Sequence, residues 1–360
     1  MEELAAVVGT RPEIIKMAPV LRAAEGRFDV HLVHTGQHYD TELSGAFFEA
    51  LELSPPDENV GVGSASQAEQ TAGALPGIER TLEQREPAAV LAVGDTNAVL
   101  STAIAASKLP TPFGHVEAGL RSFDRSMPEE VNRVLADHVA DVAFAPTEEA
   151  RNNLEREAVD DHAAVHVVGN TVVDACRQHA PLAADRSTVL ERFGLEPEEY
   201  VAATIHRPAN TDDPERLVAV AEALDSAARP VVLPAHPRTE AALEAAGWEP
   251  SGSLTLCEPL GYLDFLHLLA SARVAVTDSG GVQEEASVLE VPCLTVRPNT
   301  ERPETVEAGV NELVEPADLG PRLDRLLADD DARAAMTGHT ELYGDGDAGE
   351  RIVATLERLA

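Results

Sequence analysis

The sequence predicts an α/β protein made of two Rossmann-like, doubly wound parallel-sheet domains with an interdomain cleft. Its 360 residues are enough for two domains that each bury a core. Short apolar runs alternate with longer amphipathic stretches in both halves, a pattern typical of parallel βα units. A hinge near Gly169-Asn170 separates the halves, so we expect domains at residues 1–170 and 171–345.

Buried parallel strands read as short, continuous apolar runs bounded by turn residues. In the first half these runs predict strands at Leu4–Val8, Val30–His34, Ala88–Val93, Thr111–His115, Val142–Phe144 and Val165–Val168. In the second half they predict strands at Tyr200–Ile205, Pro230–Leu233, Leu254–Leu256, Val274–Thr277 and Cys293–Val296.

Amphipathic stretches between these runs predict helices at Gln67–Gln84, Pro128–His138, Pro214–Ala227, Tyr262–Ala270 and Gly281–Leu289, with a final helix at Ala348–Leu359. The polar, proline-containing stretch Arg177–Pro197 follows the hinge and is assigned no helix. Doubly wound folds bind ligands beyond the carboxyl ends of their strands. Residues that follow the predicted strands are therefore the candidates for a site.

The charge balance is strongly acidic and almost free of lysine. Asp and Glu total 63 against 27 Lys and Arg, a net charge of -36, and the lysines are Lys16 and Lys108 alone. The acidic residues are spread along the chain, which indicates a protein from a salt-saturated cytosol, where about 1 M salt screens charges beyond about 3 Å. Such a surface repels nucleic acid and anionic membranes, so neither is expected as a partner.

Cysteine usage and the N-terminus predict a soluble cytoplasmic protein. Cys176, Cys257 and Cys293 are far apart and odd in number, which indicates buried thiols in a reducing compartment. The N-terminus is acidic where a signal peptide needs basic residues. No apolar run approaches the roughly 18 residues of a membrane span.

The segment Thr277–Glu285 predicts a nucleotide site. It reads as the end of a strand, a tight Ser279-Gly280-Gly281 turn and the start of a helix. Unpaired N–H groups at a helix start hold phosphate, and glycines let the backbone approach the anion. Glu285 follows one turn later, where its carboxylate can accept hydrogen bonds from both ribose hydroxyls. Together these features describe a nucleoside diphosphate, although a plain strand-to-helix turn is the alternative.

The first strand-to-helix turn carries cations instead of a dinucleotide fingerprint. It reads Gly9-Thr-Arg-Pro-Glu13, with one glycine, and Gly61-Val-Gly63 elsewhere lacks a third glycine, so NAD binding is not supported. Arg11 and Lys16 are candidates for phosphate contacts because cations are scarce in this chain. A solvated surface pair is the alternative.

Three carboxylates and one histidine follow strands or open helices. Asp95, Glu117 and Glu129 are candidate acid–base groups, with helix capping as the alternative for Asp95 and for Glu129. His206 ends a strand beside Arg207, where an imidazole can donate to a phosphate or transfer a proton.

These segments together resemble the non-hydrolysing UDP-N-acetylglucosamine 2-epimerases over nearly the whole chain. The resemblance is carried by Gly9–Glu13, Gly94–Thr96, His115–Arg121, Pro128–Arg133, Gly169–Asp174, Ile205–Arg207, Thr277–Glu285, Thr300–Glu304 and Tyr343–Gly346. The stretch Arg121-Ser-Phe-Asp-Arg-Ser-Met-Pro128 resembles the archaeal branch in particular.

The resemblance implies a glycosyltransferase-B-like fold, a homodimer and a C-terminal helix at 346–360 that returns to the first domain. It implies catalytic roles for Asp95, Glu117, Glu129 and His206. It assigns substrate contacts to Arg11, Lys16, Phe265, Ser279, Gly280, Gly281, Glu285 and Arg302. The implied reaction interconverts UDP-N-acetylglucosamine and UDP-N-acetylmannosamine by elimination and re-addition of UDP through 2-acetamidoglucal, with no metal, nicotinamide or other cofactor.

Some positions depart from the family pattern. Bacterial relatives bind a second substrate molecule as activator through a Gln-His-x-Glu/Gln segment; Gln37 and His38 match it, but Asp40 takes the third place. An effector site at Gln37 and His38 is therefore a hypothesis. Leu260 stands where a polar substrate contact is expected, so it is given no role.

Three other functions share parts of this pattern. A hydrolysing epimerase would release N-acetylmannosamine and UDP with the same carboxylates. A retaining UDP-sugar glycosyltransferase would need an acceptor pocket. A non-catalytic UDP-sugar sensor would need the Ser279 turn and Glu285, but not the three carboxylates together.

The acidic composition predicts a salt-dependent fold. As KCl is lowered from about 3 M to about 0.1 M, the thermal unfolding midpoint should fall, because repulsion among the acidic groups is less screened. Circular dichroism measures the midpoint. A midpoint that stays constant or rises on dilution would contradict the prediction.

Overall fold

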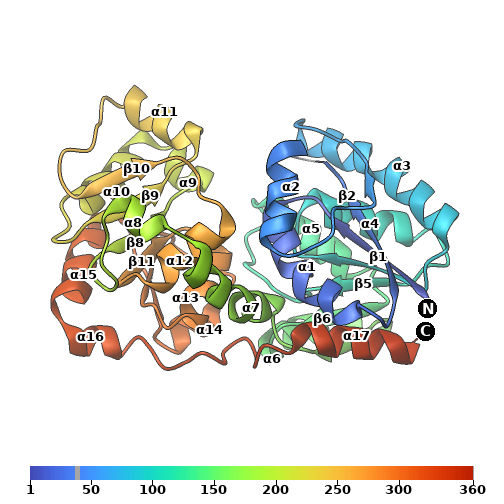
Figure 1. The fold of residues 1–360 in the computed structure, drawn as a ribbon. Helices are drawn as coiled ribbons and strands as arrows, with labels where there is room; N and C mark the ends of the chain where they lie inside the picture. Colours follow the sequence, from blue (N-terminus) through green and yellow to red (C-terminus); the bar gives the residue numbers. More distant parts are fainter. Residues whose placement is uncertain (37–40, 360) are drawn as a thin grey trace. The chain divides into compact units, whose positions relative to one another are not determined.

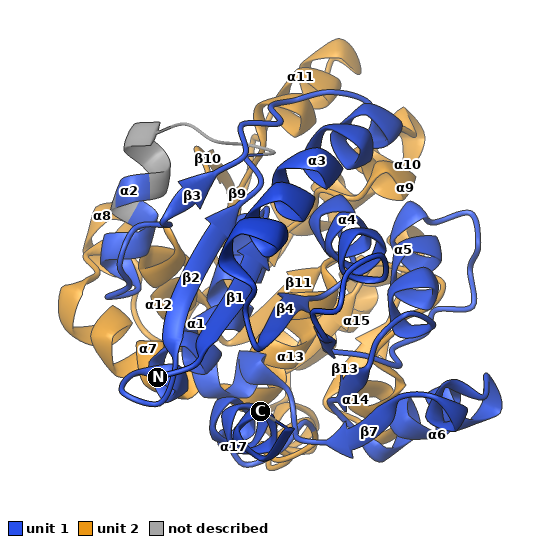
Figure 2. Ribbon diagram, turned by 90° about the vertical axis from the view of Figure 1, so that its right-hand side faces the viewer, with its two compact units in different colours: residues 1–175, 343–360 blue, residues 176–342 orange. Residues whose placement is uncertain are grey.

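The computed structural model describes residues 1–36 and 41–359. The chain divides into two compact units, coloured separately in Figure 2. Unit 1 comprises residues 1–175 and 343–360, and unit 2 comprises residues 176–342. Each unit is built on one sheet in which every strand pair is parallel, and helices connect successive strands (Figure 1).

Unit 1 has a seven-stranded sheet in the order β3-β2-β1-β4-β5-β6-β7. Its first six strands follow the order 3-2-1-4-5-6 of a doubly wound fold. The strands are β1 (Glu3–Val8), β2 (Asp29–His34), β3 (Glu58–Asn59), β4 (Ala89–Val93), β5 (Phe113–Val116), β6 (Val142–Ala145) and β7 (Ala164–Val167). The helices are α1 (Arg11–Ala24), α2 (Thr41–Ala50), α3 (Gln67–Arg85), α4 (Asn97–Ala106), α5 (Pro128–Asp137), α6 (Glu148–Arg156) and α17 (Ala348–Leu359), with a short 3₁₀ helix at Val159–Asp161.

Unit 2 repeats this topology with six strands in the order β10-β9-β8-β11-β12-β13. The strands are β8 (Val201–Thr204), β9 (Val231–Pro234), β10 (Leu254–Cys257), β11 (Val274–Thr277), β12 (Cys293–Thr295) and β13 (Asn311–Leu313). Helix α7 (Thr171–Arg186) begins in unit 1 and continues into unit 2. The other helices are α8 (Val189–Phe193), α9 (Pro208–Thr211), α10 (Pro214–Asp225), α11 (Pro237–Ala245), α12 (Tyr262–Ala270), α13 (Gly280–Val288), α14 (Pro303–Glu307), α15 (Pro316–Ala328) and α16 (Asp330–Ala334).

The central strands are buried on both faces, which confirms the predicted α/β class with two doubly wound sheets. Every residue of β4 and of β11 is buried, as expected for strands covered by helices on each side. The edge strands β3 and β13 escaped the sequence analysis because they have only two and three residues and are partly polar. The stretch Arg177–Pro197, assigned no helix, is partly helical. It contains the second half of α7, which accommodates Pro181, and all of α8.

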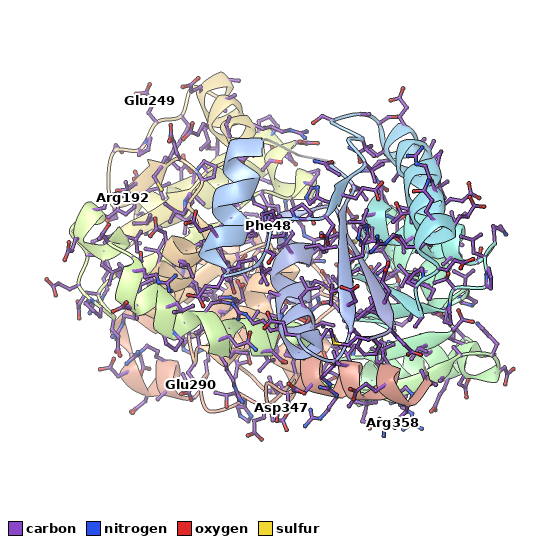
Figure 3. All side chains as sticks on the ribbon, turned by 45° about the vertical axis from the view of Figure 1, so that its right-hand side comes forward. Phe48, Arg192, Glu249, Glu290, Asp347 and Arg358 are labelled. Atoms are coloured by element: carbon purple, nitrogen blue, oxygen red, sulfur yellow. The ribbon has the colours of Figure 1, made fainter. Side chains whose placement is uncertain are left out.

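Charged side chains lie mainly on the surface. Glu249, Glu290, Asp347 and Arg358, labelled in Figure 3, are all exposed, whereas the labelled Phe48 is buried in unit 1. No described helix, in residues 1–36 and 41–359, is long and apolar enough to cross a bilayer.

The C-terminal segment is bound to unit 1 by backbone contacts. The Asn170 N–H donates to the Tyr343 carbonyl at 2.7 Å, and the Gly349 N–H donates to Asp174 Oδ1 at 2.9 Å. Helix α17 then packs against α1. The two points at which the chain passes between the units are therefore tied together within unit 1.

The contact between α17 and α1 requires a glycine. A methyl group on Gly349 would lie 2.7 Å from the Pro19 carbonyl oxygen, so Gly349→Ala should displace α17 and lower the free energy of unfolding by about 1–3 kcal/mol. Gly320→Ala is the control: it lies inside α15 with its nearest neighbour at 3.9 Å, and should raise that free energy by up to about 1 kcal/mol. Denaturant unfolding measures both. Equal effects of the two substitutions would contradict the packing argument.

Candidate active site

The carboxyl ends of β4 and β5 bring two of the predicted carboxylates to one edge of the unit 1 sheet. The strands are parallel neighbours, with Val93 opposite Val116. Asp95 follows β4 after Gly94, and Glu117 comes directly after β5. This edge is where doubly wound folds present their reactive groups.

Glu117 is buried and held in an uncommon backbone conformation. Its φ is 72°, in the left-handed region that side-chain-bearing residues rarely adopt. Its Oε2 forms an ion pair with Lys16 Nζ at 2.5 Å, and its Oε1 accepts from Asn170 Nδ2 at 3.4 Å. Lys16, which the sequence assigned to a phosphate contact, therefore also fixes this carboxylate.

Asp95 is more accessible, with 33% of its side chain exposed. It forms an ion pair with Arg133, and its carbonyl oxygen accepts from Asn132 Nδ2 at 3.0 Å. The alternative reading of Asp95 as a helix cap is wrong, because the N-cap of α4 is Thr96, whose hydroxyl accepts from the Ala98 N–H at 3.2 Å. The Asp95 carboxylate is therefore partly exposed at the carboxyl end of β4.

Glu129 and Glu130 are adjacent but are used differently. Glu129 is exposed in the first turn of α5. Glu130 is buried, accepts from the Ser122 and Phe123 N–H groups at 2.9 Å each, and pairs with Arg133 Nη1 at 2.9 Å. Arg133 thus links Asp95 to the loop that precedes α5. No contact among the described residues ties Glu129 to this network.

A fully buried ion network lies behind the two carboxylates. His115 Nδ1 is 2.6 Å from Asp137 Oδ1, and His115 Nε2 is 2.8 Å from the Gly94 carbonyl oxygen. Asp137 Oδ2 also accepts from the Gly119 N–H at 3.1 Å and pairs with Arg121 Nη1 at 2.7 Å. The one carboxylate of Asp137 therefore fixes the loop after β5 directly and the loop after β4 through His115.

The charges of this pair reinforce each other. Burial alone would lower the pKa of His115, but the Asp137 carboxylate and the carbonyl of Gly94 raise it above its usual value. Burial alone would raise the pKa of Asp137, but His115 and Arg121 hold it below its usual value. Both shifts favour the charged forms, an imidazolium beside a carboxylate.

The first turn of α1 presents Arg11 and is anchored by Glu13. Arg11 is exposed, with its guanidinium carbon 5.7 Å from the centre of the Phe47 ring. Glu13 is buried and accepts from the Gly9 and Thr10 N–H groups at 2.8 and 2.7 Å. Burial raises the pKa of Glu13 despite these hydrogen bonds.

In unit 2 the Ser279-Gly280-Gly281 turn forms the N-terminus of α13. Ser279 is the N-cap residue, and its side chain makes no capping hydrogen bond. A methyl group on Gly280 would lie 2.5 Å from Glu301 Oε1, whereas one on Gly281 would meet open space. The structure therefore explains the need for glycine at Gly280, and leaves room beside Gly281 where the sequence predicts a phosphate.

The buried Arg297 and Arg302 and the half-buried Arg207 surround Glu301 beside this turn. Arg297 Nη2 and Arg207 Nη2 lie 2.7 and 3.0 Å from its carboxylate oxygens. Burial alone would raise the pKa of Glu301, but the charges of Arg302, Arg207 and Arg297 lower it far below its usual value. Arg302 also pairs with Glu284 at 2.5 Å, so the predicted substrate contact Arg302 is buried in an ion pair. Three arginines therefore stand around the one carboxylate of Glu301, a concentration of positive charge that suits an anion.

Three further predicted residues of unit 2 lie on neighbouring elements. His206 follows β8, with its side chain 54% exposed and its Nδ1 3.3 Å from Asp278 Oδ1. Glu285 lies on α13 and is buried, and Phe265 lies half-buried on α12. Both predicted effector residues, Gln37 and His38, lie outside the described residues.

Sequence reasoning missed the residues that hold the site together. Arg133, Asp137, Asp278 and Glu301 were not singled out, although each stands inside or beside a quoted motif. Asp278 directly follows a strand end and Glu301 lies two positions before a helix start, so proximity to element ends could have found these two. Arg133 and Asp137 lie in the middle and at the end of α5, where the sequence does not tell a buried partner from a solvated charge.

The chain matches known proteins over nearly its whole length. The family model described as UDP-N-acetylglucosamine 2-epimerase matches residues 21–357. The chain is 43% identical over 366 residues to UDP-N-acetylglucosamine 2-epimerase of Methanocaldococcus jannaschii and 41% identical over 365 residues to that of Methanococcus maripaludis, covering 98% of this chain and of each relative. The crystal structure of the M. jannaschii protein in complex with UDP-GlcNAc and UDP is similar with a TM-score of 0.89 at 42% identity, covering 99% of both chains.

The His115–Asp137 pair predicts a stability maximum in mildly acidic solution. The raised pKa of His115 contributes stability that is complete below about pH 6.5 and is lost as the pH rises through the folded value. The lowered pKa of Asp137 contributes stability that is complete above about pH 4 and is lost as the pH falls through the folded value. Both contributions are therefore present between about pH 4 and pH 6.5.

Asp137→Asn should lower the free energy of unfolding in this pH range by about 3–5 kcal/mol, because it leaves His115 and Arg121 buried without their carboxylate. Denaturant unfolding at a series of pH values in concentrated KCl measures the change. The control Asp124→Asn removes a half-buried loop carboxylate that accepts from the Ser126 hydroxyl, and should have a much smaller effect. Similar losses in the two variants would show that the buried pair has no special role.

Proposed function

Because the chain belongs to the UDP-N-acetylglucosamine 2-epimerase family, we propose that it interconverts UDP-N-acetylglucosamine and UDP-N-acetylmannosamine by inverting C2. The protein is then an isomerase. The observation that carries this function is the presence of two kinds of group on the chain. Unit 1 presents carboxylates at the ends of β4 and β5, and unit 2 presents a helix N-terminus beside buried arginines.

The chemistry needs both kinds of group. The C2 hydrogen of the sugar is not next to a carbonyl, so no enolate stabilises its loss. Lengthening the C1–O bond to UDP gives C1 oxocarbenium character and makes the C2 hydrogen acidic. Elimination then yields UDP and 2-acetamidoglucal, and UDP adds back after a proton arrives at the opposite face of C2. The reaction therefore needs groups that stabilise the departing diphosphate and groups that exchange the C2 proton.

Unit 2 groups stabilise the departing diphosphate. The N–H groups at the start of α13 and the imidazole of His206 meet the negative charge that grows on UDP, an effect of about 3–4 kcal/mol for each well-placed donor. Glu285 accepts hydrogen bonds from the ribose, and Phe265 contacts the base. In unit 1, Arg11 is exposed and pairs with no carboxylate among the described residues, which suits a phosphate contact.

Unit 1 carboxylates carry the proton transfers. Asp95, Glu117 and Glu129 remove the C2 proton from one face and return one to the other. Asp95 is the accessible member of the pair at the strand ends, and Glu117 is the buried one, held by Lys16. Different environments for two neighbouring carboxylates suit two different roles in proton transfer.

The proposal also covers the salt-rich cytoplasm in which the protein works, its assembly as a homodimer and its effector site. The charge of -36 with two lysines supports a halophilic source and a salt-rich cytoplasm. The family resemblance supports a homodimer and an effector site that includes Gln37 and His38. Activation by UDP-N-acetylglucosamine is a hypothesis because Asp40 departs from the family segment, and hyperbolic turnover of pure UDP-N-acetylmannosamine in the reverse direction would count against it.

One time course tests the function against its alternatives. Pure protein is incubated with UDP-N-acetylglucosamine in D2O at high salt and followed by NMR. The proposal expects UDP-N-acetylmannosamine with deuterium at C2 and no net free sugar. Accumulating N-acetylmannosamine and UDP would identify the hydrolysing epimerase. No turnover without an acceptor would overturn an isomerase and favour a glycosyltransferase or a sensor.

Asp95→Asn should cut turnover by at least about 100-fold while UDP-sugar binding stays largely intact, because it removes a proton-transfer group and keeps the shape of the side chain. Turnover is measured by NMR and binding by calorimetry. Asp141→Asn is a matched control at the opposite end of the same sheet, where Asp141 accepts from the Phe113 N–H at 2.8 Å. It should keep near-normal turnover. Near-normal turnover of Asp95→Asn would remove Asp95 from the mechanism.

A further inference from the structure

Asp278 is a fully buried carboxylate at the carboxyl end of β11, directly before the Ser279 turn. Four groups approach its two oxygens. Oδ2 accepts from the Arg207 N–H at 2.9 Å and from Asn210 Nδ2 at 3.0 Å. Oδ1 accepts from the His206 N–H at 3.1 Å and lies 3.3 Å from His206 Nδ1. The carboxylate therefore holds His206 at two points, through its backbone and through its ring.

A purely structural role for Asp278 would be to cap the short helix α9. The Arg207 and His206 N–H groups lie at the start of that helix, and a carboxylate oxygen there satisfies them. Capping needs only the backbone contacts. The approach of Oδ1 to the ring nitrogen is an additional interaction that capping does not require.

The contact between Asp278 Oδ1 and His206 Nδ1 gives the two ring nitrogens of His206 different roles. A carboxylate next to Nδ1 favours a proton on that nitrogen, which leaves Nε2 as the variable site. The side chain is 54% exposed, and among the described residues Nε2 has no hydrogen-bond partner. A ring held in this way presents Nε2 outward, at the end of the sheet where the Ser279 turn also lies.

We propose that Asp278 is a positioning residue for catalysis, which orients the His206 ring so that Nε2–H faces the departing UDP. This inference rests on the proposed function, in which His206 assists that departure. In the elimination, the C1–O electron pair leaves with the β-phosphate oxygen, which receives the Nε2 proton. The C2–H electron pair forms the C1=C2 bond, and the C2 proton goes to a unit 1 carboxylate. Re-addition reverses these steps after protonation at the other face.

The other charged group next to Asp278 does not compete for this role. The Arg207 side chain is directed to Glu301 at 3.0 Å, so only its backbone N–H contacts Asp278. Asn210 is neutral, and it also donates to the Val296 carbonyl at 3.0 Å. Among these contacts, the His206 ring is thus the only ionisable side chain that Asp278 faces.

A double-mutant cycle tests the coupling. Asp278→Asn should lower kcat by about 10–100-fold and change KM by less than about threefold, because orientation of the proton donor acts on the chemical step. In a His206→Ala background the same substitution should change kcat by less than about threefold, because there is no ring left to position. Equal losses in both backgrounds, or no loss in the His206-containing enzyme, would overturn the proposal.

Asn210→Ala is the matched control, since it removes a hydrogen bond to the same carboxylate without touching His206. It should keep kcat within about threefold. A loss as large as that of Asp278→Asn would show that the carboxylate acts on the fold and not on His206.

A second measurement needs no Asp278 variant. Nitrogen-15 NMR of the wild-type histidines, with the His206 signal assigned by its absence in His206→Ala, reports the tautomer of the neutral ring. The proposal expects the proton on Nδ1, and a proton on Nε2 with bare Nδ1 would overturn it. Failure of the wild-type enzyme to epimerise would instead overturn the proposed function. Normal kcat of His206→Ala would remove His206, and with it the role of Asp278, while leaving the epimerase function intact.

Discussion

Buried ion pairs at the carboxyl ends of the parallel strands determine where the reactive groups of this protein lie. Asp137 fixes the loops after β4 and β5 through His115, the Gly119 N–H and Arg121. In unit 2 the buried carboxylate of Asp278 fixes the loop after β8 by accepting from the backbone N–H groups of His206 and Arg207. Buried charges are costly to desolvate unless each is paired and hydrogen-bonded. The pairs therefore favour one loop geometry strongly, because any other leaves a charge unmatched.

The acidic composition separates into two sets of charges, one on the surface and one buried. The surface carries the acidic excess, as the exposed Glu249, Glu290 and Asp347 illustrate. The scarce cations are mostly arginines, and several of them are buried. A planar guanidinium can pair with two carboxylates at once, as those of Arg133 and Arg121 do. Salt screens the surface repulsion but affects the buried pairs far less. Site geometry and salt tolerance thus depend on different charges.

Much of the fold could be predicted from the sequence because buried parallel strands are continuous apolar runs, as β4 and β11 are. The edge strands β3 and β13 were too short and polar for that signal, and Pro181 concealed the helical character of α7. The site was predictable to the level of strand ends, which gave Asp95, Glu117 and His206. The partners that orient them were not, because a buried Asp and a solvated Asp look the same in one sequence, and only the packed structure separates Glu130 from Glu129.

The central claim is that the bond between the sugar C1 and the diphosphate oxygen breaks while C2 is inverted. It is tested most directly with UDP-N-acetylglucosamine that carries oxygen-18 in this bridge, followed by phosphorus NMR during epimerisation. The account predicts that the label moves from the bridge to the non-bridging oxygens of the β-phosphate at a rate comparable to or faster than epimerisation. A label that stays in the bridge while C2 is fully equilibrated would contradict it.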